Sequence, residues 1–241
     1  MDFFCLSEKG KYRADNEDCV RSELNESYAL SVVCDGMGGE AAGRIAADKA
    51  SERFMAYATT ALKTGNDLRI PATLISATES ANRVVYNLSM DVEEYSGMGT
   101  TLVAVYLSDS IGYVVNIGDS RAYKISGQSI QRLTHDHSYV QELVDLGLLT
   151  EPEAKRHPRK NLITRAIGIQ RHIQTDIFET EVAPGDIFVL CSDGLCGVVT
   201  DGQILSLVLQ GGGAEKIGSR LIRAAMELGS RDNITVSVIA V

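Results

Sequence analysis

Three β-rich runs follow one another in the middle of the chain, at residues 100–107, 111–117 and 121–126, with only short breaks of Ser, Asp and Gly between them. Breaks this short join antiparallel neighbours, because a parallel crossover needs a dozen or more residues. We therefore expect an antiparallel meander here, and a fold in which hairpins connect most neighbouring strands.

Strand-like and helix-like periodicities alternate along the rest of the chain. Further strands are expected at residues 3–7, 28–34, 172–180, 187–191 and 234–241, and helices at 41–61, from 71 onward, at 201–209 and at 214–228. Residues 138–165 lose the strand pattern and are expected to form an inserted flap with two short helices. Hairpin-connected strands favour an α+β fold, a four-layer αββα sandwich of two central antiparallel sheets flanked by helices.

Length and composition limit what else the chain can be. Its 241 residues, 44% of them hydrophobic, can bury one substantial core, so we expect residues 1–241 to form a single domain. The start lacks a cationic segment followed by an apolar run, and no stretch of about 18 apolar residues occurs, so neither secretion nor a membrane span is expected. Five cysteines without a Cys-x-x-Cys pair indicate reduced thiols and a cytoplasmic protein.

The charge of the chain argues against binding to nucleic acid. Its formal net charge is -9 at pH 7, whereas affinity for a phosphate backbone comes from clustered Lys and Arg. One basic cluster does occur, formed by Lys155, Arg156, Arg159 and Lys160. It has two interpretations, a solvated loop face or a contact with an acidic or phosphorylated protein.

Five aspartates lie in segments marked by glycine, asparagine or serine: Asp18, Asp35, Asp119, Asp193 and Asp232. Asp35 and Asp193 each follow an apolar run and precede a glycine, and Asp232 precedes the last expected strand, so these three carboxylates can converge at strand ends. Any one such pair is typical of an ordinary turn. Their repetition favours a site for two or three hard cations such as magnesium or manganese.

Eight short motifs occur in the order seen in metal-dependent PP2C-type (PPM) serine/threonine protein phosphatases. They are Arg13-x-x-Asn16-Glu17-Asp18, Asp35-Gly36-Met37-Gly38-Gly39, Gly97-Met98-Gly99-Thr100-Thr101, Gly118-Asp119-Ser120-Arg121, Leu133-Thr134-x-Asp136-His137-Ser138, Leu162-Ile163-Thr164-Arg165-Ala166-Ile167-Gly168, Ser192-Asp193-Gly194 and Ser230-Arg231-Asp232-Asn233. Each motif alone is weak evidence, but together they span nearly the whole chain. The chain resembles the compact bacterial form of this family.

The resemblance implies a site for two Mn²⁺ or Mg²⁺ ions. Asp35 would bridge both metals, the Gly36 carbonyl would bind one of them, and Asp193 and Asp232 would bind the other. Asp18 would act mainly through metal-bound water, supported by its neighbour Glu17.

Two further positions follow from the same resemblance. Asp119, together with Asp193, matches the position that can hold a third, weaker ion near the flap. Arg13 matches the arginine that grips the substrate phosphate, and a guanidinium suits that role because it donates two parallel hydrogen bonds to phosphate oxygens.

The expected chemistry is hydrolysis of phosphoserine and phosphothreonine on proteins, by a hydroxide that bridges the two metals and attacks phosphorus in line. Some eukaryotic members carry a histidine after the Asp-Gly pair as a general acid, but this chain has Met37, so metal-bound water is the expected substitute. His135 and His137 are possible acids by residue type alone, and we assign the role to neither.

Alternative functions remain open at this level. The expected partners are phosphorylated proteins, including serine/threonine kinases that the enzyme would oppose, and the chain is expected to be a monomer. A non-catalytic or partner-switching regulator could keep the same fold for protein binding. Retention of Arg13 and of the acidic cluster favours the enzyme, since a pure binding domain has no use for desolvated acids. A phosphatase of small phosphoesters is a third possibility.

Overall fold

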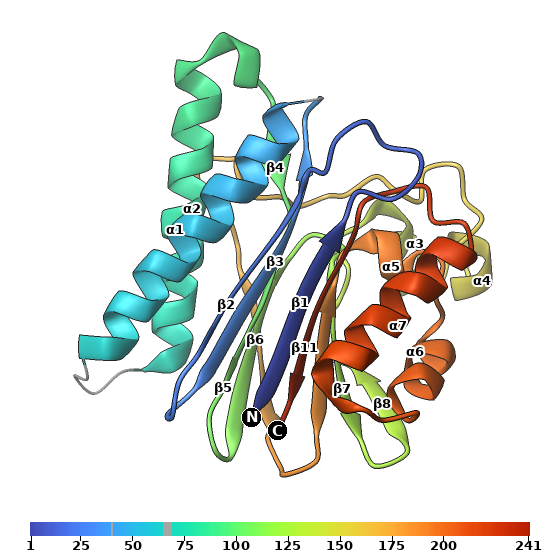
Figure 1. Ribbon diagram of the computed structural model, residues 1–241. Helices are drawn as coiled ribbons and strands as arrows, with labels where there is room; N and C mark the ends of the chain where they lie inside the picture. The colour runs from blue at the N-terminus through green and yellow to red at the C-terminus, as the bar shows by residue number, and fades with distance from the viewer. Residues whose placement is uncertain (40, 65–68) are drawn as a thin grey trace.

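The protein is described by a computed structural model that covers residues 1–39, 41–64 and 69–241. Figure 1 shows its elements in order along the chain. The strands are β1 (Asp2–Glu8), β2 (Asp18–Leu24), β3 (Ala29–Met37), β4 (Gly99–Thr100), β5 (Leu102–Leu107), β6 (Ile111–Ile117), β7 (Arg121–Ser126), β8 (Ser129–Arg132), β9 (Asp176–Glu181), β10 (Ile187–Cys191) and β11 (Ile234–Ala240). The helices are α1 (Ala42–Thr64), α2 (Ile70–Asp91), the 3₁₀ turn η1 (Glu93–Tyr95), α3 (Tyr139–Asp145), α4 (Glu151–Ala154), α5 (Asp193–Cys196), α6 (Asp201–Val208) and α7 (Gly213–Glu227).

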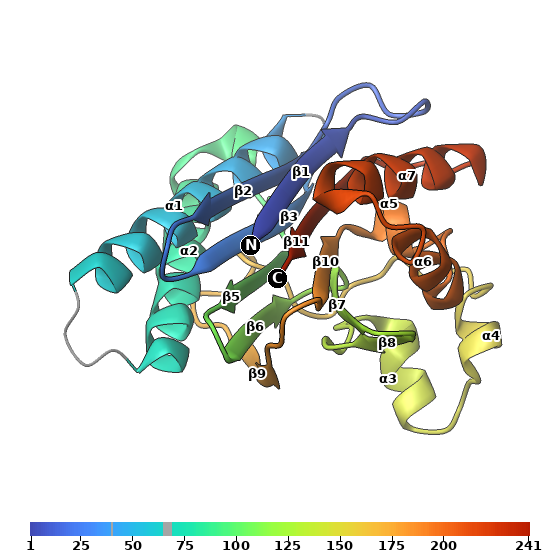
Figure 2. The same cartoon turned by 60° about the horizontal axis from the view of Figure 1, so that its bottom comes forward.

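Two antiparallel sheets form the centre of the molecule. One has the strand order β1-β11-β10-β7-β8, and the other has the order β2-β3-β5-β6-β9, with β4 paired to β3. Helices α1 and α2 cover the outer face of the second sheet, whereas α6 and α7 cover the first (Figure 2). The predicted four-layer αββα sandwich is therefore confirmed.

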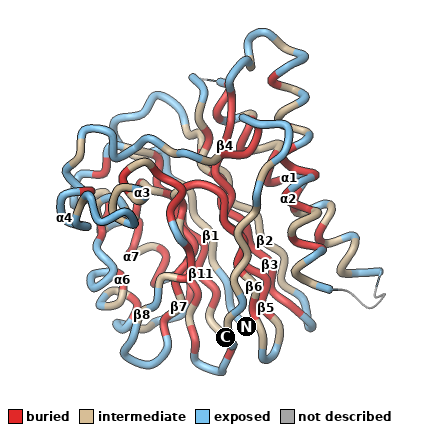
Figure 3. The backbone as a smooth tube through the Cα atoms, turned by 180° about the vertical axis from the view of Figure 1, so that it is seen from behind, coloured by how far each residue is buried: buried red, intermediate tan, exposed pale blue. Residues whose placement is uncertain are grey.

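Three apolar cores hold these layers together, one in each space between them. The core under α1 and α2 contains Phe54 and Leu74, and the core under α6 and α7 contains Leu221 and Val236. The third core, which contains Phe188 and Leu190, lies between the sheets. Each fully buried large side chain stabilises the fold by roughly 1.5–3 kcal/mol. The buried backbone in Figure 3 is accordingly concentrated in the strands.

The predicted meander is wrong at one connection. Strands β5 and β6 pair as expected, but β6 pairs next with β9, whereas β7 lies in the other sheet beside β10. The chain changes sheets at residues 118–120, where Gly118 has a φ of 102° that favours glycine. A break of three residues fits a crossing between stacked sheets as well as a hairpin, so its length alone could not distinguish them.

Smaller differences concern element ends. The strand expected at 172–180 forms at Asp176–Glu181, and the sequence patterns did not predict β2, β8 or the short helix α5. The expected flap contains α3 and α4 as predicted, with Gly147 at a φ of 70° just beyond α3. Within the described residues, none of the helices combines the length and apolar character needed to cross a membrane.

Candidate active site

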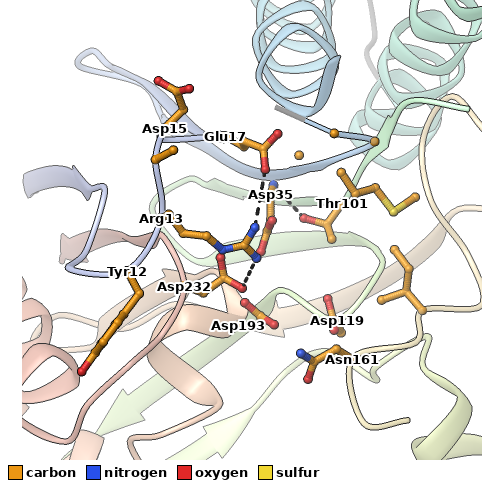
Figure 4. Close-up of a pocket in the computed structure, with 16 residues that line it drawn as sticks. Tyr12, Arg13, Asp15, Glu17, Asp35, Thr101, Asp119, Asn161, Asp193 and Asp232 are labelled. Atoms are coloured by element: carbon orange, nitrogen blue, oxygen red, sulfur yellow. Dashed lines mark hydrogen bonds and ion pairs between the residues drawn. The ribbon is translucent and has the colours of Figure 1, made fainter. Parts of the chain in front are cut away.

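A pocket with a volume of about 480 Å³ gathers most of the predicted site residues (Figure 4). It is lined by Arg13, Gly36 and the aspartates Asp35, Asp119, Asp193 and Asp232. The fifth aspartate, Asp18, does not line this pocket, because it is buried behind it at 8% exposure. Residues from both ends of the chain thus meet at one side of the sandwich.

Both sheets contribute carboxylates to the site. Asp18 begins β2 and lies directly opposite Asp35 of β3 in the antiparallel register. Asp119 lies in the turn that joins β6 to β7, Asp193 is the first residue of α5, and Asp232 precedes β11. The prediction that Asp35 ends its strand is wrong, because β3 continues to Met37 through the pairing of Gly36 with Thr100 in β4.

The backbone of Asp35 is held by two threonines. Its N–H donates to Thr101 Oγ1 over 3.0 Å, and its carbonyl accepts from Thr101 N–H at 2.9 Å and from Thr100 Oγ1 at 2.8 Å. Thr101 Oγ1 in turn shares a hydrogen bond of 2.7 Å with Ser120 Oγ, at the crossing between the sheets. These contacts link the position of Asp35 to the turn that carries Asp119.

Two glycines beside the aspartates permit close backbone packing. A Cβ on Gly36 would lie 2.1 Å from the carbonyl oxygen of Gly43 at the start of α1. A Cβ on Gly194 would lie 1.8 Å from the carbonyl oxygen of Asn233. The Asp-Gly pairs therefore serve the packing of these loops, a reason that the turn pattern in the sequence did not reveal.

Asp18 is held by Ser192, which the sequence analysis placed in a motif without giving it a role. Ser192 Oγ donates to Asp18 Oδ2 over 2.7 Å and accepts from Thr235 N–H at 3.0 Å. The other carboxyl oxygen of Asp18, Oδ1, is buried and makes no hydrogen bond. Asp193 Oδ1 is likewise buried without a hydrogen-bond partner. Such oxygens are costly to bury unless something else binds them.

The clustered carboxyl groups have raised pKa values. Burial raises the pKa of Asp18 to about 7, of Asp119 to about 8 and of Asp193 to about 6, and neighbouring carboxylates add to each rise. The pKa of Asp35 lies well above 3.8 for the same two reasons, burial first and then the charge of Asp18. Ionising all of these carboxyl groups together is therefore unfavourable unless positive charge is brought to the cluster.

This donor set fits hard divalent cations, which prefer carboxylate and carbonyl oxygens and would neutralise the repelling charges. The unpartnered oxygens of Asp18 and Asp193 point to the same need. Among the residues that the structure describes, however, no three acidic, His or Cys side chains are already arranged around one ion position. Asp232 is instead paired with Arg13, whose Nη2 lies 2.7 Å from Asp232 Oδ2.

Arg13 lies at the rim of the pocket with its side chain 46% exposed. Its second contact with an acid is longer, 3.8 Å from Nη1 to Glu17 Oε2. A guanidinium carries five N–H donors in a planar fork, so donors remain for a phosphate that enters the pocket. The hydrogen bond to Asp232 raises the pKa of Arg13 further, which keeps its charge at every working pH.

Asn233 and His137 hold loops of the site rather than face the pocket. Asn233 Oδ1 accepts from Glu17 N–H at 2.9 Å, and its Nδ2 donates to the carbonyls of Lys9 and Asp15 at 2.9 Å each. His137 Nδ1 accepts from Gly118 N–H at 3.1 Å, next to Asp119. Both residues lie in the eight motifs, but nothing in the sequence indicated that they hold loops together.

Neither histidine considered as an acid reaches the pocket. His137 is buried, and burial lowers its pKa, so its Nε2–H donates to Asp176 over 3.0 Å as a neutral ring. His135 pairs with Asp145 on the surface at 2.8 Å. Neither histidine is therefore placed to act as the general acid.

Known proteins resemble this chain over almost its full length. A family model described as protein phosphatase 2C matches residues 10–213. Protein phosphatase PhpP of Streptococcus pneumoniae is 35% identical over 242 residues, which cover 100% of this chain and 97% of PhpP.

Solved structures give the same result. Serine/threonine phosphatase Stp1 of Staphylococcus aureus matches with a TM-score of 0.91 and 32% identity, covering 100% of this chain and 95% of that one. The catalytic domain of the serine/threonine protein phosphatase PstP, in complex with two manganese ions, matches at 0.83 and 34% identity, covering 98% and 96%. The family model and these relatives agree with the fold and with the carboxylate pocket. The chain belongs to the protein phosphatase 2C family.

Proposed function

We propose that the protein hydrolyses phosphoserine and phosphothreonine on other proteins, with two divalent cations bound in the carboxylate pocket. One observation carries the proposal: carboxyl groups from both sheets converge beside an arginine, and burial, followed by repulsion between the carboxylates, raises their pKa values. An active site tolerates such a cluster when cations and a phosphate are its ligands.

The pocket residues suit distinct roles in this reaction. Asp35 and the Gly36 carbonyl bind the metals together with Asp193 and Asp232, and Asp18 supports them from behind the pocket. Asp119 and Asp193 are the donors for a third, weaker ion. Mn²⁺ and Mg²⁺ both fit this oxygen donor set.

Divalent cations supply a nucleophile made from water and offset the charge of the phosphate. Arg13 binds the phosphate oxygens at the rim and orients the phosphorus toward the floor of the pocket. For this, Arg13 must exchange part of its contact with Asp232 for the phosphate. Met37 lines the pocket and neither His135 nor His137 does, so the leaving serine or threonine oxygen takes its proton from water.

The proposal extends to the protein as a whole. We assign residues 1–241 to one phosphatase domain. Residues 138–165 are its flap, because this segment between β8 and β9 contains α3 and α4 but contributes no strand to either sheet. Five free thiols suit the cytoplasm. There the enzyme, as a monomer, would remove phosphates that serine/threonine kinases add to proteins. Phosphorylated kinases would be among its substrates.

Turnover of a phosphothreonine peptide in Mn²⁺, compared with nucleotides and sugar phosphates, tests this function. We expect the peptide to have the highest kcat/KM, and no turnover after chelation. Faster turnover of the small phosphoesters would support the third possibility instead. A folded protein that binds phosphoproteins and hydrolyses nothing would support the regulator.

A pair of isosteric variants tests the site assignment. Asp193→Asn removes a charge from the pocket and should abolish turnover while the protein stays folded. Asp109→Asn makes the same change at an exposed position in the β5–β6 hairpin and should leave turnover intact. Wild-type activity in Asp193→Asn would overturn the assigned role of this residue.

A further inference from the structure

A second cavity, with a volume of about 560 Å³, lies between the flap and the α5–α6 segment. We call it the flap cavity. Its apolar lining comes from Val140 and Val144 of the flap and from Val198 and Val199 after α5. The catalytic chemistry described above uses none of these residues.

The flap cavity opens beside the catalytic pocket. Asp119, Asn161 and Asp193 line both spaces, and Figure 4 shows these three side chains at the same end of the catalytic pocket. An extended peptide advances about 3.3 Å per residue, so a segment bound with its phosphate at Asp193 can place a nearby side chain in the flap cavity. The two spaces together can therefore hold a phosphorylated residue and one of its neighbours.

Basic side chains of the flap supply charge to this cavity. Lys155 and Lys160 line it, and among the described residues neither has an acidic partner within ion-pair distance. Lys160 directly precedes Asn161, which lines both the flap cavity and the catalytic pocket. Arg132 lines the cavity too, with only a distant contact of 4.0 Å to Asp136.

The acidic residues of the flap cavity are largely committed elsewhere. Asp136 accepts three hydrogen bonds from Arg121, at 3.0, 3.1 and 2.5 Å, and Asp201 accepts one from Tyr123 at 3.2 Å. Glu151 is exposed to solvent. Asp119 and Asp193 also line the cavity, but in the proposed function the cations of the catalytic pocket would bind them. With those two occupied and Asp136 paired with Arg121, the basic side chains Arg132, Lys155 and Lys160 outnumber the remaining acids, Glu151 and Asp201.

We propose that the flap cavity receives an acidic side chain of the substrate, close in sequence to the phosphorylated residue, and that Lys155 and Lys160 are its charge partners. This rests on the proposed phosphatase function and deepens it: the preferred substrates are phosphoproteins whose phosphorylated residue has an acidic neighbour. The basic cluster of the flap thereby acquires a role beyond that of a solvated face.

A set of phosphothreonine peptides tests the proposal. One aspartate is moved through the four positions on either side of the phosphothreonine, and each peptide is compared with its asparagine counterpart in Mn²⁺. At one or more positions we expect kcat/KM to be about three- to fivefold higher with aspartate, the size of a partly exposed ion pair. Lys155→Gln and Lys160→Gln should each reduce that ratio toward one, and Lys155→Arg should retain it.

Arg156→Gln is the matched control, because Arg156 belongs to the same exposed cluster but does not line the cavity. Its aspartate-to-asparagine ratio should match that of the wild type. A ratio of one at every position in the wild-type enzyme would overturn the flap-cavity proposal, and so would an equal loss in Arg156→Gln. In either case, turnover of the asparagine peptides would still support the phosphatase function.

Discussion

Replacing Asp18 by asparagine should stabilise the metal-free protein at alkaline pH. The carboxyl group of Asp18 is buried, holds one hydrogen bond from Ser192 and leaves Oδ1 without a partner. Burial raises its pKa from 3.8 to about 7. Asparagine keeps the shape and an oxygen for Ser192, but it carries no charge that the folded state must desolvate.

The magnitude follows from linkage between protonation and folding. With a raised folded-state pKa, the native chain binds a proton that the unfolded chain releases, so the stability present below pH 3.8 is lost as the pH rises through about 7. Between pH 5 and pH 8 the free energy of unfolding falls over about two pH units, from pH 5 to the folded-state pKa of about 7. At 1.36 kcal/mol per unit this is a loss of ~3 kcal/mol. The gain from Asp18→Asn should be larger at pH 8 than at pH 5 by that amount, because asparagine does not titrate.

Thermal unfolding with a chelator at the two pH values measures this difference. For a chain of this length, ~3 kcal/mol corresponds to a Tm change of roughly 6–12 °C. Taking the difference between pH values cancels the pH-independent cost of a weaker hydrogen bond from Ser192. An equal change in Tm at pH 5 and pH 8 would refute the argument, since the pKa of Asp18 would then not be raised in the folded protein.

Three further substitutions follow from the same contacts. Arg13→Lys should raise KM for a phosphopeptide about tenfold, since an ammonium cannot donate two parallel hydrogen bonds; an unchanged KM would exclude phosphate binding by Arg13. Asp136→Asn leaves Arg121 without its buried charge partner and should lower the free energy of unfolding by ~3 kcal/mol in urea, whereas an unchanged midpoint would contradict it. Gly194→Ala places a Cβ 1.8 Å from a backbone carbonyl oxygen and should lower both Tm and turnover, whereas Gly202→Ala, with open space at its Cβ, is its neutral control.

Local patterns predicted most of the secondary structure because each element depends on its own periodicity. The apolar run before Asp35 is a strand in the structure, and the helix expected from residue 71 onward forms as α2. The connection at Gly118 was mispredicted because a break of three residues suits either a hairpin or a crossing between sheets. Which one forms depends on whether β7 packs better beside β6 or β10, and no local pattern contains that comparison.

The sequence by itself determined which side chains are available for chemistry: five aspartates at marked positions, Arg13 before Asn16, and eight motifs in family order. Only the tertiary structure decided their relation to one another. It buries Asp18 behind the pocket on Ser192 and brings carboxylates from both sheets together, which raises their pKa values. The physical reason is that desolvation and repulsion depend on distances between residues far apart in the chain, and the packing of the two sheets sets those distances.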